Sequence, residues 1–406
     1  MEYIEVFNQL KKTIKYDADE IVINDKIILR NFDFESKFHS ILPGGLENEN
    51  SLSDLMSFVE YKPEPDLIKE VLNIQDAYIT ENINFRYHVM MPKDEIKSKD
   101  VLFLFHGFNE KSWVKYFPWA QYIIEKTGKA IIFFPIAFHM NRAPALWSDS
   151  REMYSICKQR QTRHSDIIAS SFSNVAISSR QHNNPLRFIW SGFQTYYDVI
   201  ELITSVKTGI HSAIHPDAKI DIFSYSIGSL LSEILLMTNT NGYFSQSRLV
   251  SFCGGAAFNK LTPVSKSILD NEAHECLLSH LAVNLDSLMK QDAKLCEYME
   301  NYPEGKNFRS MLNYDTFVKY REDKFNEISR RIYAIALKKD KVFPSEEIVN
   351  TLKGKEHNIP IRIDILDYPF NYSHEEPFPA KESISKEVTE HFKKTFDLAC
   401  NFLNKN

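Results

Sequence analysis

The sequence predicts an α/β protein in which a mostly parallel central sheet carries helices on both faces. Short, continuous apolar runs recur along the chain, as expected for strands that are buried on both sides of a parallel sheet. Segments with helical spacing of apolar residues separate these runs, and this alternation is the pattern of a doubly wound sheet. The runs that we assign to the central strands are 101–105, 130–135, 220–223, 249–253, 332–337 and 361–366.

Helices are expected on both sides of these strands. Their predicted ranges are 113–127, 193–208, 227–237, 344–352 and 383–403. The last one carries its apolar residues on one stripe, so it should pack against the sheet. Before the central strands, residues 83–91 alternate between apolar and polar side chains, which is typical of an outer antiparallel strand. We predict residues 74–80 as the hairpin partner of this strand, with the turn at Glu81 and Asn82.

The start of the chain has a different pattern and is predicted to form an N-terminal extension, residues 1–70, before a main domain at 71–406. Tyr3, Phe7 and Leu10 recur at helical spacing, and apolar residues on both sides of 24–26 predict a β-hairpin. We expect the extension to pack on the main domain as a structural clasp. The alternative is a partner-binding role, which would require a large exposed apolar patch on this segment.

The segment 221–230 points to function. The apolar run that ends at Phe223 leads into Ser-Tyr-Ser-Ile-Gly at 224–228, and apolar residues at helical spacing follow. This is the layout of a nucleophile elbow, in which Ser226 occupies the sharp turn between a strand and a helix. Unpaired backbone N–H groups at the helix N-terminus can stabilise an oxyanion there. Ser224 stands at the position where this motif usually has glycine. Ser224 and Gly228 are both small, which suits the close approach of strand and helix.

A second feature lies upstream, where the apolar run 101–105 ends in His106 and Gly107. A glycine at a strand end lets the following backbone N–H point into a site. We therefore expect the N–H groups of Phe108 and Ile227 to form an oxyanion hole. His106 precedes the serine, and we interpret it as a structural residue beneath this loop rather than as the base.

Two polar residues follow strand ends downstream. Asp340 comes after the strand 332–337 and before Pro344, and His374 lies on the loop before the C-terminal helix. Together with Ser226 they stand in the order serine, acid, histidine that this architecture requires. The sequence alone leaves competitors for these roles in poorer positions. Asp364 and Asp367 lie on or beside the last strand, His357 precedes that strand, and His391 lies inside a helix.

On these motifs, the chain resembles the α/β-hydrolase superfamily over about residues 70–406. The resemblance implies that Ser226 attacks a carbonyl, that His374 takes and returns the proton, and that Asp340 orients the imidazole. The expected function is a cofactor-free serine hydrolase that cleaves an acyl ester, thioester or amide through an acyl-enzyme. Esterase, lipase, thioesterase and peptidase activities remain open, as does acyl transfer to an acceptor other than water. The alternative is a catalytically inactive α/β-hydrolase-like protein that binds a ligand or partner in the same cleft.

Two insertions interrupt the predicted core, at about 139–190 and 259–329. The first holds seven arginine and lysine residues against three acidic ones, a local charge of +4 in a chain of net charge −6. This excess makes a small-molecule acyl substrate with a carboxylate or phosphate one option, and a solvated loop with scattered basic residues the other. The second insertion is rich in helix-forming residues and should cap the site. The aromatic candidates for an apolar pocket are Phe108, Trp113, Trp147, Trp190 and Tyr225.

Composition argues against several other functions. The net charge of −6 and a pI near 6.1 disfavour nucleic-acid binding, which needs a basic face. The five cysteines are scattered without a C-x-x-C pair, and His211 and His215 lack a third ligand, so no disulfide framework, metal or cofactor is expected. The N-terminus has no signal-peptide pattern, and the longest apolar run, 130–138, is too short to span a bilayer. We therefore expect a cytoplasmic protein, of undetermined oligomeric state.

Overall fold

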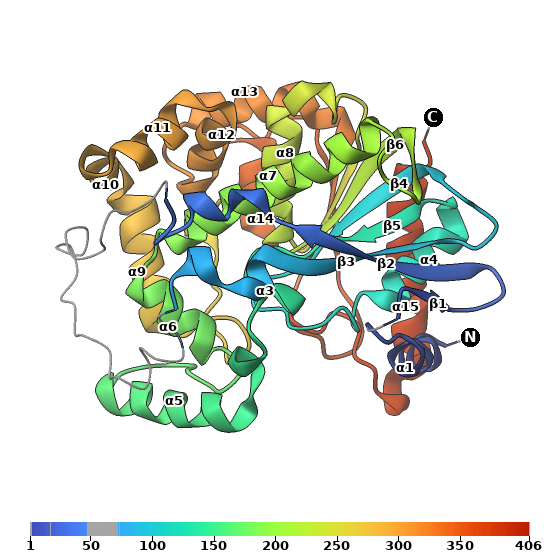
Figure 1. Cartoon of the computed structure of the whole chain (residues 1–406), viewed down its shortest axis with the longest axis horizontal. Coiled ribbons are helices and arrows are strands. Elements are labelled where there is room, and N and C mark those ends of the chain that lie inside the picture. Colours follow the sequence, from blue (N-terminus) through green and yellow to red (C-terminus); the bar gives the residue numbers. More distant parts are fainter. Residues whose placement is uncertain (1, 17, 47–71, 73, 406) are drawn as a thin grey trace.

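The computed structural model of the chain describes residues 2–16, 18–46, 72 and 74–405. These residues build a nine-stranded sheet with the order β1-β2-β3-β5-β4-β6-β7-β8-β9 (Figure 1). Neighbours from β1 to β5 in this order pair antiparallel, and neighbours from β5 to β9 pair parallel. The strands are β1 (Glu20–Val22), β2 (Ile27–Glu35), β3 (Asn84–Pro92), β4 (Ser98–Phe105), β5 (Ala130–Phe133), β6 (Ile214–Tyr225), β7 (Leu249–Phe252), β8 (Ile332–Leu337) and β9 (Arg362–Leu366).

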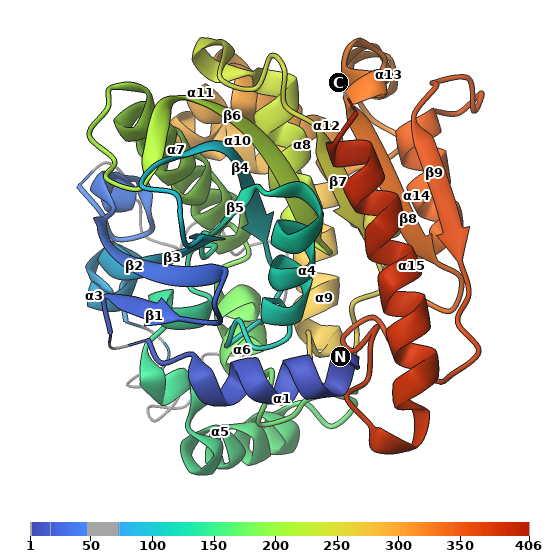
Figure 2. The ribbon, with the colours of Figure 1, turned by 90° about the vertical axis from the view of Figure 1, so that its right-hand side faces the viewer.

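Helices cover both faces of this sheet (Figures 1 and 2). One face carries α1 (Tyr3–Thr13), α4 (Phe117–Thr127) and α15 (Ser385–Leu403), and the other carries α7 (Arg187–Lys207), α8 (Gly228–Thr238) and α14 (Ser345–Lys353). Alternate side chains of β4 point to opposite faces of the sheet. Leu102 and Leu104 pack in the core on one face, and Phe103 and Phe105 pack in the core on the other face. The architecture confirms the predicted fold class, an α/β-hydrolase fold. Within the described ranges, no helix is both long and apolar enough to cross a membrane.

The N-terminal segment adds two strands to the sheet and one helix to a face of it. β1 and β2 form the hairpin that the sequence predicts, and β2 pairs with β3 along its whole length. Helix α1 packs against α4 and α15, and the Tyr3 N–H donates to Thr389 Oγ1 at 2.8 Å. The segment thereby continues the central sheet. The predicted boundary between residues 70 and 71 lies outside the described residues.

The strand prediction for residues 74–80 is wrong. The chain forms two short helices here, η3 (Asp76–Tyr78) and α3 (Thr80–Ile83), and β2 occupies the edge of β3 that a strand would have needed. The physical reason is the burial of Asp76, whose carboxylate accepts hydrogen bonds from two arginines far along the chain, Arg180 and Arg187. These tertiary contacts hold the segment against the helices rather than in the sheet.

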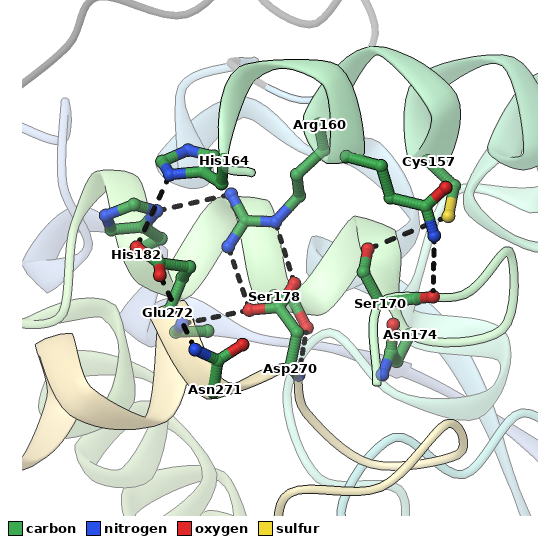
Figure 3. A network of polar contacts seen from close by, with 12 residues as sticks. Cys157, Arg160, His164, Ser170, Asn174, Ser178, His182, Asp270, Asn271 and Glu272 are labelled. Carbon is green, nitrogen blue, oxygen red and sulfur yellow. Dashed lines mark hydrogen bonds and ion pairs between the residues drawn. The ribbon is translucent and has the colours of Figure 1, made fainter. Parts of the chain in front are cut away.

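The two insertions form helices that pack on one another. The first contains α5 (Ser150–Arg163) and α6 (Val175–Asn183), and the second contains α9 (Asn271–Leu277), α10 (Leu285–Gln291), α11 (Ala293–Asn301), α12 (Pro303–Leu312) and α13 (Val318–Ile328). A buried ion pair joins them, because Arg160 donates to both carboxylate oxygens of Asp270 at 2.7 and 2.9 Å (Figure 3). The Asp270 N–H also donates to Ser178 Oγ at 3.1 Å.

Several basic residues of the first insertion are buried against acids from other segments. Arg142 pairs with Asp198 at 2.8 Å, and Arg160 pairs with Asp270. Arg180 and Arg187 share the single carboxylate of Asp76. These carboxylates all lie outside residues 139–190, so they offset a large part of the local excess of positive charge that the sequence shows.

Candidate active site

Ser226 occupies the turn between β6 and α8 with a φ of 58°, in the left-handed region that side-chain-bearing residues rarely adopt. The packing around this turn is close. A Cβ built at Gly228 would lie 2.9 Å from the carbonyl oxygens of Phe105 and His106, so the position needs glycine. Ser224, the first small residue of the motif, is buried beneath the turn. The strained turn presents the Ser226 side chain beyond the carboxyl end of the strand.

Three side chains from distant loops meet at this edge of the sheet. Ser226 Oγ lies 2.7 Å from His374 Nε2, and His374 Nδ1 lies 2.7 Å from Asp340 Oδ2. The other oxygen of Asp340 accepts the N–H groups of Val342 and Phe343 at 2.8 and 3.0 Å. Because a carboxylate only accepts, Nδ1 carries the ring proton and Nε2 is left to accept the serine hydroxyl. The structure therefore brings together the serine, the acid and the histidine that the sequence singled out.

The competing residues lie outside this cluster. Asp364 and Asp367 make hydrogen bonds to side chains around β9 and the following loop. His357 is exposed and its Nε2 contacts Asn350 Oδ1 at 2.9 Å. His391 is half-buried on α15 and its Nδ1 contacts the Glu387 carbonyl at 2.9 Å.

Aromatic rings hold the His374 imidazole in place. The rings of Tyr225 and Phe343 stack on it, with centroid distances of 5.3 and 5.5 Å. The Tyr225 hydroxyl also donates to the backbone carbonyl of His374. Lys115 Nζ lies 4.6 Å from the centre of the Tyr225 ring and donates to the Glu375 carbonyl at 3.2 Å. The sequence indicated Tyr225 only as a pocket-lining candidate, because nothing in the local pattern signals these contacts.

Two backbone donors stand beside the cluster. Neither the Phe108 N–H nor the Ile227 N–H donates a hydrogen bond to another group in the described part of the chain. Ile227 directly follows Ser226, and Phe108 lines the same cavity as the serine hydroxyl. N–H groups without partners beside a serine are the kind of donor that an oxyanion hole requires.

Gly107 sits tightly against the serine, and a hydrogen-bond relay fixes its orientation. A Cβ at this position would lie 3.3 Å from Ser226 Cβ, so glycine leaves the room that the serine side chain needs. The Gly107 N–H donates to the Tyr116 hydroxyl at 3.0 Å, and this hydroxyl donates to Glu110 Oε1 at 3.0 Å. Lys115 pairs with the same carboxylate. The relay orients the loop that carries the Phe108 N–H.

His106 is fully buried beneath this loop, and backbone groups occupy both of its ring nitrogens. Nδ1 contacts the Gly107 carbonyl at 2.8 Å, and Nε2 accepts the Ile136 N–H at 3.0 Å. Burial lowers the pKa of His106 well below its usual range, so the ring is neutral and donates through Nδ1. Its contacts position the loop and do not reach the serine.

The cluster opens on a cavity of about 720 Å³ lined by Ser226 and His374 together with mainly polar residues, among them Lys111 and Lys115. Of the other aromatic candidates, Trp147 lines a neighbouring hollow, whereas Trp113 and Trp190 are packed in the core. Among the residues that the structure describes, no group of three or more histidine, cysteine or acidic side chains is arranged to hold a metal ion.

Comparison with known proteins gives one family. A model described as a family of unknown function (DUF6051) matches residues 1–404. A comparison with curated proteins gave no match.

Several solved structures are similar to the chain at low identity. Carboxyl esterase 2 from the mycorrhizal fungus Tuber melanosporum is 12% identical with a TM-score of 0.42, over 79% of this chain and 82% of that chain. An esterase from Rhizomucor miehei is 9% identical with a TM-score of 0.42, over 98% and 87%. An esterase from Pyrobaculum calidifontis is 12% identical with a TM-score of 0.39, over 78% and 80%.

Proposed function

The chain belongs to the family of unknown function DUF6051, and we propose that it is a serine hydrolase that cleaves an acyl ester, thioester or amide. One observation carries the proposal. An unbroken line of contacts runs from Asp340 Oδ2 through the His374 ring to Ser226 Oγ, with 2.7 Å at each step. A general base must lie within hydrogen-bond reach of the proton that it takes, and this geometry meets that condition.

In the first half of the reaction, Ser226 Oγ attacks the carbonyl carbon of the substrate while His374 Nε2 takes the hydroxyl proton. The N–H groups of Phe108 and Ile227 donate to the carbonyl oxygen as it becomes negative. Asp340 stabilises the imidazolium and keeps its Nδ1 proton in place. His374 then gives its Nε2 proton to the departing alcohol, thiol or amine, and the acyl group stays on Ser226 as an ester.

In the second half, a water molecule attacks the acyl ester and His374 takes one of its protons. The same two N–H groups stabilise the second tetrahedral intermediate. Its collapse breaks the bond to Ser226, and His374 returns the proton to Oγ. The carboxylic acid leaves and the starting enzyme is restored, so no other reactant is needed.

The alternative, an inactive protein that binds a ligand in the same cleft, has weaker support. A binding protein has no need for a serine in a strained conformation, for a 2.7 Å contact to histidine or for two N–H groups without partners. An anionic substrate is also less well supported than the sequence suggests. Several arginines of the first insertion are buried in ion pairs with Asp76, Asp198 and Asp270.

A fluorophosphonate probe tests the proposal, because it reacts covalently with an activated serine. We expect the wild type to be labelled and Ser226→Ala to be unlabelled with an unchanged far-ultraviolet circular dichroism spectrum. Ser373→Ala is the matched control, since this exposed serine lies next to His374 in sequence and should not affect labelling. A folded wild-type protein that neither reacts with the probe nor cleaves any acyl substrate would contradict the proposal.

A further inference from the structure

A second, narrow hollow adjoins the site and differs from it in character. It lies between helices α7 and α8, and α12 of the second insertion contributes Phe308 and Glu304 to its wall. Its other walls are mainly apolar and include Phe188, Leu231 and Ile234. Buried apolar surface of this kind, beside a reactive group, is typical of a pocket for the apolar part of a ligand.

The apolar pocket begins at the site. Phe108 and Ile227, whose N–H groups face the reacting carbonyl in the proposed mechanism, also line this pocket. The Phe108 ring lies 6.2 Å from the Phe188 ring at the start of α7. Along α8 the lining continues from Ile227 to Ile234, a rise of about 10 Å at 1.5 Å per residue. The pocket therefore leads away from the serine between two helices.

We propose that this apolar pocket binds the acyl group of the substrate, and that the natural substrates carry an uncharged acyl chain of medium length. The inference rests on the proposed serine hydrolase function. When the carbonyl oxygen points to the N–H groups of Phe108 and Ile227, the acyl chain begins where these two residues open the pocket. The leaving group then lies in the open polar cavity that holds Ser226 and His374.

Phe308 sets the width of the pocket. Its ring stacks on Phe188 with a centroid distance of 6.1 Å. It also lies against Gly192 of α7, where an added Cβ would stand 3.2 Å from the ring. The absence of a side chain at Gly192 lets the ring approach the helix, so one aromatic side chain from the second insertion closes the space between α7 and α8.

Glu304 gives the pocket its charge preference. Its carboxylate is buried and accepts the Tyr197 hydroxyl at 2.8 Å, one residue beyond the pocket-lining Tyr196. The Tyr196 hydroxyl contacts Thr240 just after the C-terminal end of α8, so Tyr197 and Glu304 lie toward the end of the pocket that is farther from Ser226. An acyl chain ending in a carboxylate would bring a second negative charge to this end, which is unfavourable in a buried setting.

Hydrolysis of 4-nitrophenyl esters of increasing chain length tests the inference. We expect kcat/KM to rise at least tenfold from the acetyl to the octanoyl ester and to fall again for the palmitoyl ester. Full burial of one methylene would give about fourfold, the equivalent of about 0.8 kcal/mol. We expect an ester whose acyl chain has octanoyl length and ends in a carboxylate to react at least tenfold more slowly than the octanoyl ester. Glu304→Gln should reduce this difference in rate.

Two variants with a matched control locate the effect. Ile234→Phe should fill the far end of the pocket and reduce the octanoyl-to-acetyl ratio of kcat/KM at least tenfold. Phe308→Ala should widen the pocket and shift the optimum to longer chains. Phe325→Ala is the control: it removes a buried phenylalanine ring from α13, outside the pocket. It should leave the octanoyl-to-acetyl ratio of kcat/KM unchanged. The ratio is internal to each sample, so partial unfolding of a variant does not distort it.

The outcomes separate the two proposals. An active enzyme that depends on Ser226 but shows no chain-length preference, or whose preference survives Ile234→Phe, overturns the acyl pocket and leaves the serine hydrolase standing. A protein that cleaves no ester and reacts with no fluorophosphonate overturns the hydrolase and the acyl pocket together. A chain-length optimum that moves with the pocket variants and not with Phe325→Ala supports both.

Discussion

Two buried polar clusters in this molecule are assembled in the same way. At the edge of the sheet, Ser226, His374 and Asp340 come from three separate loops and meet in contacts of 2.7 Å. Between the insertions, Arg160 and Asp270 come from segments 110 residues apart and also meet at 2.7 Å (Figure 3). Burial and short polar contacts therefore do not distinguish the two.

The two clusters differ in whether their polar groups all have partners within the protein. Asp270 accepts two hydrogen bonds from Arg160 and also caps α9 by accepting the Ala273 N–H. Both of its carboxylate oxygens therefore already have partners within the protein. Ser226 instead faces a cavity, in a strained conformation and beside two N–H groups without partners. A polar cluster whose groups satisfy one another joins segments, whereas one that leaves a side chain facing a cavity beside unpaired donors is a candidate functional site.

The largest expected effect comes from a pair of matched acid-to-amide changes. Asp340→Asn should lower kcat by about 10³- to 10⁴-fold, because the amide no longer favours the tautomer that leaves Nε2 free. Asp270→Asn should leave kcat per folded molecule within about twofold. Steady-state kinetics on both variants measures kcat, and active-site titration corrects it for the fraction of active molecules. Equal losses of kcat would show that the two clusters are not functionally distinct.

Removing one partner of the insertion pair should affect stability more than rate. Arg160→Met leaves the Asp270 carboxylate buried without its cation, which costs about 3–5 kcal/mol of unfolding free energy. Urea denaturation measures this loss, and kinetics at low temperature should show a nearly normal kcat. The double change Arg160→Met with Asp270→Leu should recover part of the stability. A normal stability with a large loss of kcat would contradict the structural role.

The insertion cluster should also make stability depend on pH. Burial, and then the charge of Arg160, lower the pKa of His182 to about 3, against about 6.5 in an unfolded chain. As pH falls below 6.5, the unfolded chain binds a proton that the folded chain does not, so stability decreases with falling pH. His182→Gln should therefore reduce the loss of unfolding free energy between pH 7 and pH 5 by about 1–2 kcal/mol. An unchanged pH dependence of stability in His182→Gln would contradict this prediction.

The smallest effect should come from the hydrogen-bond relay that orients the loop carrying the Phe108 N–H. Tyr116→Phe removes the acceptor of the Gly107 N–H, and we expect kcat to fall about two- to tenfold because one hydrogen bond contributes about 0.5–1.5 kcal/mol. Tyr122→Phe on α4 is the matched control, since its hydroxyl contacts Asp397 at 2.8 Å, away from the site. Comparable losses of kcat in both variants would refute the positioning role of Tyr116.

Local pattern was enough to predict the central strands and the three residues that meet at the candidate site. β8 begins and ends at the predicted residues, because a continuous apolar run between polar segments has few alternatives to a buried strand. Ser226, Asp340 and His374 were identifiable because each follows a strand, and the carboxyl ends of parallel strands meet at one edge. The order of strands and loops along the chain therefore indicated that these three residues meet at one edge of the sheet.

Only the tertiary structure decided which distant side chains pair. Asp76 looks like an ordinary acid in sequence, yet its burial between two arginines turns a predicted strand into short helices. The charge excess of the first insertion is offset by acids from outside it, and the apolar pocket exists because Phe308 of the second insertion reaches α7. Periodicity and motif spacing are local properties that one segment carries alone. Ion pairs, stacked rings and cavities depend on packing between segments, which no single segment encodes.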